Sequence, residues 1–400
     1  MSDTTDGDEM TEHPAPPAPG SASVMLLGAG ERSRELASAF ERLGAEVTIV
    51  EKYADAGALT ALVDAQKPHY VVADAGAVAT DAWITIAERG DVEVFPTPRS
   101  TRLSLDGEGL RRLAADELGL PTAPFWFAGS ADELTAVATH AGFPLVVKPV
   151  AAAPGEGESV LLRPEDIQPA WRRAVAGGRL SMQRVMAETV VEVDFEVTLL
   201  TVRTTGPAGP VVHFCEPIGH RQSEGDALES WQPQQLSPAA LDAAKSIAAR
   251  IVNSLGGRGV FSVELLVRGD EVYFADVRPR PHDTGLVTLR SQRLSQFELQ
   301  ARAVLGLPVD TIMISPGAVE VTYAQANDGG ESESSDVDDT QLQLVLADAL
   351  AVAESDVRLF GRSDSAEARG WRTLALATAP DPIVARDRVR RVATALRRLR

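Results

Sequence analysis

Two acidic side chains, Glu264 and Asp276, flank a tight turn in a segment whose alternating apolar and polar residues predict a β-hairpin. Antiparallel pairing around that turn places Glu264 near Phe274 or Ala275, so both carboxylates approach the same end of the hairpin. Two neighbouring, buried carboxylates repel each other unless a cation lies between them. Mg²⁺ binds few protein carboxylates and leaves room for nucleotide phosphates. The pattern therefore predicts a magnesium site, with side chains that simply face solvent as the alternative.

A second candidate lies in residues 146–160, where a β-branched run leads to Lys148 and then to the turn Gly155-Glu156-Gly157. Glycines let a backbone approach phosphate oxygens and point its N–H groups at them. Glu156, however, stands where an anion favours a cation. A negative side chain a few ångströms from a triphosphate opposes its binding by about 1 to 4 kcal/mol, depending on screening. The stretch therefore predicts a phosphate-binding loop whose affinity for phosphate is reduced by Glu156.

Two further polar segments are candidates for a site. In RPRPHDTG, prolines fix the backbone, so that Arg278 and Arg280 can hold a carboxylate or phosphate in a preset geometry. His282 in the same segment is expected to be a hydrogen-bonded structural residue, with proton transfer as the alternative. Residues 219–234 read as a long polar loop, and loops of this length often cover or line a site. A solvated loop without such a role is the alternative.

The composition restricts the class of protein. The 400 residues are 44% hydrophobic and 24% charged, and no apolar run approaches the roughly 20 residues that a membrane span needs. Cys215 is the only cysteine, which excludes a disulfide framework and a zinc site of several thiolates and fits a reducing cytoplasm. A net charge of −19 opposes sequence-independent nucleic-acid binding. Seven arginines in the last fifteen residues predict a basic face on a closing amphipathic helix, with an RNA or membrane-surface patch as the alternative.

The elements that position these residues show two kinds of sequence pattern. The first hundred residues predict a small parallel-sheet domain that opens with a βαβ unit around Gly28 and Gly30. Those two glycines begin a dinucleotide fingerprint, but Ser33 takes the place of the third, so NAD binding is the weaker alternative. From Met182 onward, alternation predicts antiparallel strands, with a helix over residues 237–255.

Several stretches resemble the formate-dependent glycinamide ribonucleotide transformylases of the ATP-grasp superfamily. VVKPV, DFEVTLLTV, GHRQ, ESWQPQQLSP and RPRPHDTG carry the resemblance, which covers about residues 24–378. It implies an α/β fold of the α+β ATP-grasp type. The expected parts are a disordered acidic tail (1–22), a parallel-sheet pre-ATP-grasp domain (23–105), an ATP-grasp domain with antiparallel sheets (106–312), and a small β-rich C-terminal domain (313–400) with an acidic loop (328–340) and a basic terminal helix.

The resemblance also implies an activity and a set of site residues. In this family ATP phosphorylates formate to formyl phosphate, and the amine of glycinamide ribonucleotide then attacks it. ATP and Mg²⁺ would be the cofactors, and the protein would be a cytoplasmic homodimer without nucleic-acid or membrane partners. The implied residues are Lys148, Glu188, Val191 and Glu196 for the nucleotide; Glu264 and Asp276 for Mg²⁺; Gly155, Gly157, Arg280 and Asp283 for catalysis; and Glu31, Asp283, Arg362 and Arg369 for the ribonucleotide.

The chain departs from the family pattern at both ends of the expected site. Gly107 stands where the family has a nucleotide-contacting arginine, and Asp276 replaces a glutamate. The family's Gly-Glu-Leu-Gly turn is Gly30-Glu31-Arg32-Ser33, its Pro-Glu-Ile-Glu segment is Ala73-Asp74-Ala75-Gly76, a lysine is replaced by Arg362, and an arginine pair is reduced to Arg369-Gly370. These departures leave open a divergent paralogue that uses another amine acceptor or binds nucleotide without turnover. A scaffold with a basic tail is a third alternative.

Overall fold

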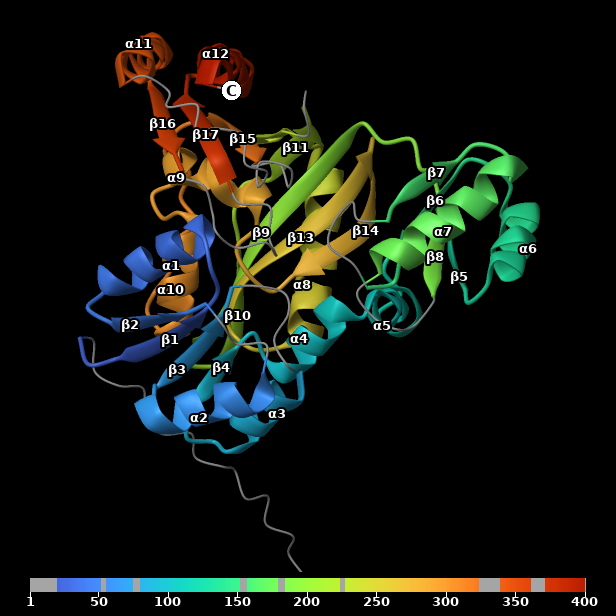
Figure 1. Cartoon of the computed structure of the whole chain (residues 1–400), viewed down its shortest axis with the longest axis horizontal. Coiled ribbons are helices and arrows are strands. Elements are labelled where there is room, and N and C mark those ends of the chain that lie inside the picture. The colour runs from blue at the N-terminus through green and yellow to red at the C-terminus, as the bar shows by residue number, and fades with distance from the viewer. Residues whose placement is uncertain are drawn as a thin grey trace, which may run out of the picture.

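The described part of the chain forms three β-sheets with helices packed around them (Figure 1). The computed structural model describes residues 20–51, 55–74, 80–151, 157–178, 184–223, 227–323, 339–360 and 371–399. The predictions for Gly155, Glu156, Arg362, Arg369, the tail up to residue 19 and most of the acidic loop lie outside these residues. No helix in the described ranges is long and apolar enough to cross a membrane.

The N-terminal sheet is parallel, as predicted, with the strand order β2-β1-β3-β4. Its strands are β1 (Ser23–Leu27), β2 (Glu46–Val50), β3 (Tyr70–Ala73) and β4 (Glu93–Phe95), and the helices that follow them are α1 (Glu31–Glu41), α2 (Ala56–Gln66), α3 (Thr80–Glu88) and α4 (Pro98–Leu105). At the carboxyl end of β1, a Cβ on Gly28 would meet the Ser33 hydroxyl at 2.4 Å, so any larger residue there would have to displace that hydroxyl. Ligands of parallel sheets bind outside the carboxyl ends of the strands. The amino end of α1 and the end of β3 therefore face the expected ligand side.

A second, antiparallel sheet lies on the right in Figure 1, with the order β5-β8-β6-β7. Its strands are β5 (Phe125–Ala128), β6 (Leu145–Pro149), β7 (Ser159–Leu161) and β8 (Val185–Thr189). The helices that connect them include α6 (Ala131–Ala141), the 3₁₀ helix η2 (Pro164–Asp166) and α7 (Ile167–Gly177). Leu134 of α6 and Ile167 of α7 pack with Leu145 and Val147 in one buried cluster. The chain enters this sheet from α5 (Gly107–Arg112) through a π-helical turn, Leu113–Glu117. The apolar face of the sheet is thus occupied by helices.

The third sheet has nine strands, in the order β14-β13-β9-β11-β12-β15-β17-β16, and β10 also pairs with β9. The strands are β9 (Phe195–Gly206), β10 (Gly209–Phe214), β11 (Ile218–Gln222), β12 (Leu228–Gln232), β13 (Gly259–Arg268), β14 (Glu271–Arg278), β15 (Gly317–Tyr323), β16 (Ser355–Leu359) and β17 (Trp371–Thr378). The helices around it are α8 (Pro238–Leu255), η4 (Asp283–Val287), α9 (Thr288–Ser291), α10 (Gln296–Val304), α11 (Asp339–Leu350), α12 (Pro382–Leu396) and η6 (Arg397–Leu399). Strands on both sides of residue 313 belong to this sheet, and the domain boundaries stay a prediction.

The N-terminal and nine-stranded sheets share one hydrophobic core. Leu36 and Phe40 of α1 belong to the same buried cluster as Phe297 and Val304 of α10, and the cluster extends to Val260 of β13. This contact fixes the carboxyl ends of the N-terminal strands against the segment that follows β14.

The polar run from residue 219 to 234 is not a long loop, and that prediction is wrong. Most of the run forms a hairpin of β11 and β12, in which His220 pairs with Ser230 and Arg221 with Glu229. Both faces of this hairpin carry polar side chains, so it lacks the apolar alternation by which a half-buried strand is recognised.

The closing helix α12 is amphipathic, as predicted, with Val389, Val392 and Leu396 buried. Its arginines bind acids of the neighbouring strands. Arg386 and Arg390 both pair with Glu229, which is almost completely buried. This arrangement favours a structural role for much of the basic face over an RNA or membrane patch.

Candidate active site

A β-bulge places the two predicted metal ligands side by side. Glu264 of β13 pairs directly with Asp276 of β14, because the register shifts by one residue between Glu264 and Leu265. The prediction that Glu264 lies opposite Phe274 or Ala275 was therefore wrong by one or two positions. Directly paired residues point to the same face of a sheet, so the bulge brings both carboxylates to one face. The signal for it is the apolar spacing in β14, which changes from two residues to three between Phe274 and Val277.

The electrostatics of this pair suit a divalent cation. Burial, and then the neighbouring charge of Asp276, raise the pKa of Glu264 to about 7. Arg278 Nη2 lies 2.6 Å from Asp276 Oδ2, and His282 Nδ1 lies 3.9 Å from Glu264 Oε1. Within the described part of the chain, no three His, Cys, Asp or Glu side chains gather as a metal site. Two carboxylates fit Mg²⁺ that completes its coordination with nucleotide phosphates and water.

The predicted nucleotide residues Lys148 and Glu188 lie together on the second sheet. Lys148 Nζ on β6 is 2.6 Å from Glu188 Oε2 on β8, and the other carboxylate oxygen pairs with Arg111. Arg111 also donates to the carbonyl oxygens of Phe274 (3.3 Å) and Ala275 (3.1 Å) at the bulge. It thereby links the second sheet to the metal-site hairpin.

Arg111 was missed by the sequence reasoning. Arg111 follows Leu110 and stands three residues before Ala114 in one helical segment, and all three residues are buried. An arginine among such neighbours is rarely buried without a partner, and this is the signal that could have identified it.

The remaining nucleotide residues lie on the same side. Glu196 of β9 pairs in register with His220 of β11, and Thr198, two residues on, pairs with Glu264, so Glu196 and Glu264 share a face. Burial, and then the charge of Glu158, raise the pKa of Glu196. Val191 lies in the connection between β8 and β9, next to the second sheet.

Two buried polar atoms on this face have no hydrogen-bond partner among the described residues. They are Nε2 of His220 and Oγ of Ser230, which face each other across the β11–β12 hairpin. Burial lowers the pKa of His220 to about 4, so its imidazole is neutral at pH 7. Such atoms are normally satisfied by a ligand or an ordered water.

Asp283 and Arg280, which are predicted to act at the substrate amine, lie where the carboxyl ends of the N-terminal strands meet η4. Asp283 Oδ2 accepts from the Tyr323 hydroxyl at 3.0 Å, and Asp283 Oδ1 accepts from Trp371 Nε1 at 3.2 Å. Arg280 Nη1 donates to the carbonyl oxygen of Asp74 at 3.0 Å. Burial, and then the charge of Arg32, lower the pKa of Arg280 to about 9.

Two other predicted residues are placed by the structure as follows. Glu31 is buried in the first turn of α1, next to Arg32. Gly157 lies two residues before β7 with φ near 70°, a left-handed conformation that favours glycine.

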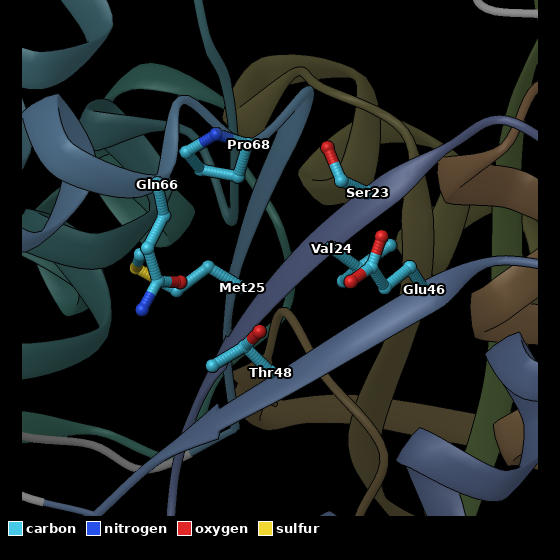
Figure 2. A pocket seen from close by; sticks show the side chains of 7 residues that line it. All are labelled: Ser23, Val24, Met25, Glu46, Thr48, Gln66 and Pro68. Atoms are coloured by element: carbon cyan, nitrogen blue, oxygen red, sulfur yellow. The ribbon is translucent and has the colours of Figure 1, made fainter.

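A pocket on the N-terminal sheet is separate from this constellation. It is lined by Ser23, Val24, Met25, Glu46, Thr48, Gln66 and Pro68 (Figure 2). The strand residues among them lie between the first and the middle residue of β1 and β2, Gln66 is the last residue of α2, and Pro68 lies between α2 and β3, whereas Gly28 and Asp74 follow the carboxyl ends of β1 and β3. The pocket is therefore not part of the candidate active site.

The two antiparallel sheets, with Lys148 and Glu188 on one and Glu264 and Asp276 on the other, define an ATP-grasp protein. Residues 113–297 match the ATP-grasp domain family. The chain is 48% identical over 400 residues to a formate-dependent phosphoribosylglycinamide formyltransferase of Corynebacterium efficiens, covering 95% of this chain and 97% of that relative. A relative with the same name from Burkholderia mallei is also 48% identical, over 401 residues and 96% of each chain.

Solved structures agree with this relationship. The structure of glycinamide-RNase-transformylase T from Mycobacterium tuberculosis is 49% identical, with a TM-score of 0.77 over 93% of this chain and 99% of that one. A carboxyaminoimidazole ribonucleotide synthase of Aspergillus clavatus, 21% identical with a TM-score of 0.78 over 95% of this chain and 100% of that one, shows the shared fold. This chain belongs to the family of formate-dependent phosphoribosylglycinamide formyltransferases.

Proposed function

We propose that the chain formylates glycinamide ribonucleotide with formate at the expense of ATP. ATP phosphorylates formate to formyl phosphate with release of ADP, and the amine of the ribonucleotide attacks the formyl carbon with release of phosphate. The observation that carries the proposal is the paired Glu264 and Asp276, beside Lys148 on one side and the Arg280–Asp283 segment on the other. Full-length relatives that bear this activity in their names support it. They favour it over a divergent ligase, a non-catalytic nucleotide binder or a scaffold.

The nucleotide end would use groups from both antiparallel sheets. Lys148 is a cation for the phosphates, and on nucleotide arrival it would exchange its present partner Glu188 for them. Glu188 and the backbone near Val191 would contact the adenine, and Glu196 the ribose. Gly155 and Gly157 would provide backbone N–H groups for the phosphates.

Glu264 and Asp276 would hold Mg²⁺, and Arg278 pairs with the carboxylate of Asp276. When bound, the ion neutralises phosphate charge during phosphoryl transfer. The chain's own contribution is to hold two carboxylates on one face at the end of a rigid hairpin. The aspartate is shorter than the family's glutamate, and the bulge at Ala275 aims it at the partner carboxylate.

The acceptor end would hold the amine next to the formyl group. Asp283 is fixed by Tyr323 and Trp371, so its carboxylate is oriented before an amine arrives. Arg280 would stabilise negative charge on the acyl phosphate, since it is a half-buried cation close to the end of β14. Glu31, Arg362 and Arg369 would contact the ribonucleotide.

The assembly and location that we propose follow the family. We propose a homodimer in the cytoplasm, which the single, buried Cys215 suits because it forms no disulfide within the chain. The negative net charge supports small-molecule substrates over nucleic acid as partners.

The test of the function is ADP release by the purified protein with Mg-ATP, formate and glycinamide ribonucleotide, omitting each in turn. Glu264→Gln is the blank, because it keeps the side-chain shape and removes one carboxylate of the pair. ADP release that requires all three substrates and is lost in the variant supports the proposal. Release that ignores the ribonucleotide, or none above the blank from folded protein, contradicts it.

A further inference from the structure

The departures from the family pattern at the acceptor end bond to one another. Arg32 and Ser33 stand in the turn where the family has leucine and glycine, and Asp74 lies in the segment that replaces Pro-Glu-Ile-Glu. In the structure, Arg32 Nε lies 3.0 Å from Asp74 Oδ1, and the Ser33 hydroxyl donates to Asp74 Oδ2 at 2.8 Å. Changes at two distant points of the sequence therefore form a single structural unit.

This unit extends to the residue predicted to face the amine. Arg32 Nη1 reaches Asp283 Oδ1 at 3.4 Å, across 251 residues of sequence, and Arg32 Nη2 donates to the carbonyl oxygen of Asp74 at 3.3 Å. Arg280 donates to that same carbonyl. A guanidinium thus occupies the acceptor end at a position where the family has an apolar side chain.

Arg32 is held firmly and remains able to bind a ligand. A guanidinium has five N–H donors, and the described residues take three of those of Arg32. The side chain is mostly buried yet about one quarter exposed, and its other two donors have no partner among the described residues. Burial would lower the pKa of Arg32, but Asp74 and Asp283 outweigh it and raise the pKa, so the cation persists.

We propose that Arg32 is a specificity-determining residue of the acceptor site, which orients Asp283 and binds an oxygen of the acceptor molecule close to its amine. In glycinamide ribonucleotide that oxygen is the glycinamide carbonyl, one methylene group away from the amine. An amine on Asp283 and a carbonyl on Arg32 would fix the acceptor at two points, which a leucine at this position cannot do. This inference rests on the proposed function and adds a residue to it.

The test compares Arg32→Leu, Arg32→Lys and the control Arg34→Leu in the full-length protein. Arg34 lies on the same helix and is exposed. Losing a charge-assisted hydrogen bond weakens binding by roughly tenfold or more, so we expect Arg32→Leu to raise the KM for glycinamide ribonucleotide at least that much. The KM values for ATP and formate should change less than about twofold, because Arg32 is proposed to contact neither of these substrates. Arg32→Lys should recover part of the loss, and Arg34→Leu should behave like the parent protein.

Equilibrium binding of glycinamide ribonucleotide without ATP provides a readout that does not depend on turnover. We expect Arg32→Leu to raise the Kd for glycinamide ribonucleotide by the same factor as its KM. Unchanged affinity in folded Arg32→Leu, or an equal loss of ATP and ribonucleotide binding, would overturn the inference. If Arg32→Leu does not fold, Arg32→Lys decides, and an unchanged KM for the ribonucleotide in that variant rejects the assignment. Failure of the proposed function would appear in the parent protein itself, as turnover that does not need the ribonucleotide.

Discussion

Replacing Glu229 with glutamine should destabilise the protein strongly, although Glu229 lies behind the candidate active site. Its carboxylate is 1% exposed and binds three arginines. Arg386 grips both oxygens, from Nε at 2.9 Å and Nη2 at 3.1 Å, and its guanidinium lies 3.7 Å from the centre of the Trp231 ring. Glutamine keeps the shape of the side chain but leaves these cations without their anion.

Removing one partner of a buried ion pair costs about 3 to 5 kcal/mol. Arg221 and Arg390 are 52% and 48% exposed and can turn toward water, so we expect the lower end of that range, about 3 kcal/mol. Urea unfolding of the parent and of Glu229→Gln, monitored by circular dichroism, measures the difference. A loss of this size would establish that α12 is anchored through its arginines.

The matched control is Asp348→Asn, which removes an exposed pair with Arg398 of the same C-terminal region. Exposed pairs contribute about 0 to 1 kcal/mol, so this variant should hardly change the unfolding midpoint. Burial would raise the pKa of Glu229, but the arginines outweigh it and lower that pKa. The stabilisation is therefore present above the unfolded-state pKa and disappears as the pH falls through the folded-state pKa. A Glu229→Gln loss no larger than that of Asp348→Asn at pH 7 would refute the reasoning.

Three further predictions concern the candidate active site and the single cysteine. The pKa of Glu264 is raised from near 4.5 to about 7, so the folded protein without Mg²⁺ should lose up to about 3 kcal/mol of stability as the pH rises through this window. Urea unfolding at pH 5 and pH 8 measures this loss, and Glu264→Gln should abolish it. Lys148→Met should raise the Kd for ATP, measured by calorimetry, roughly tenfold or more, whereas Lys245→Met on α8 should leave it unchanged. Burial raises the pKa of the Cys215 thiol to about 12, so iodoacetamide should label it only after unfolding, and rapid labelling of the native protein would contradict its burial.

The elements were predictable where their periodicity is simple. The βαβ start, the helix α8 and the hairpin around Gly269 all follow from local alternation and turn residues. The β11–β12 hairpin was not predictable in this way. Its His220 and Ser230 face the candidate site, whereas Arg221 and Glu229 form ion pairs on the other face. A strand that is polar on both faces has no periodic apolar signal.

The site was predictable in its residue types but not in its contacts. The acidic pair followed from the hairpin, whereas the bulge that aligns Asp276 depends on one extra residue in β14. The contact of Arg32 with Asp283 had no local signal, because it forms only when α1 packs against α10 and brings two distant segments together. Long-range contacts of this kind depend on the packing of the whole fold.

Transfer of isotopically labelled formate to glycinamide ribonucleotide tests the central claim most directly. The protein is incubated with Mg-ATP, ¹³C-formate and the ribonucleotide, and the products are analysed by mass spectrometry. We predict a formylated ribonucleotide that carries the label, formed in step with ADP and absent with Glu264→Gln. ATP consumption without a labelled ribonucleotide, or label on another amine alone, would contradict the proposed function.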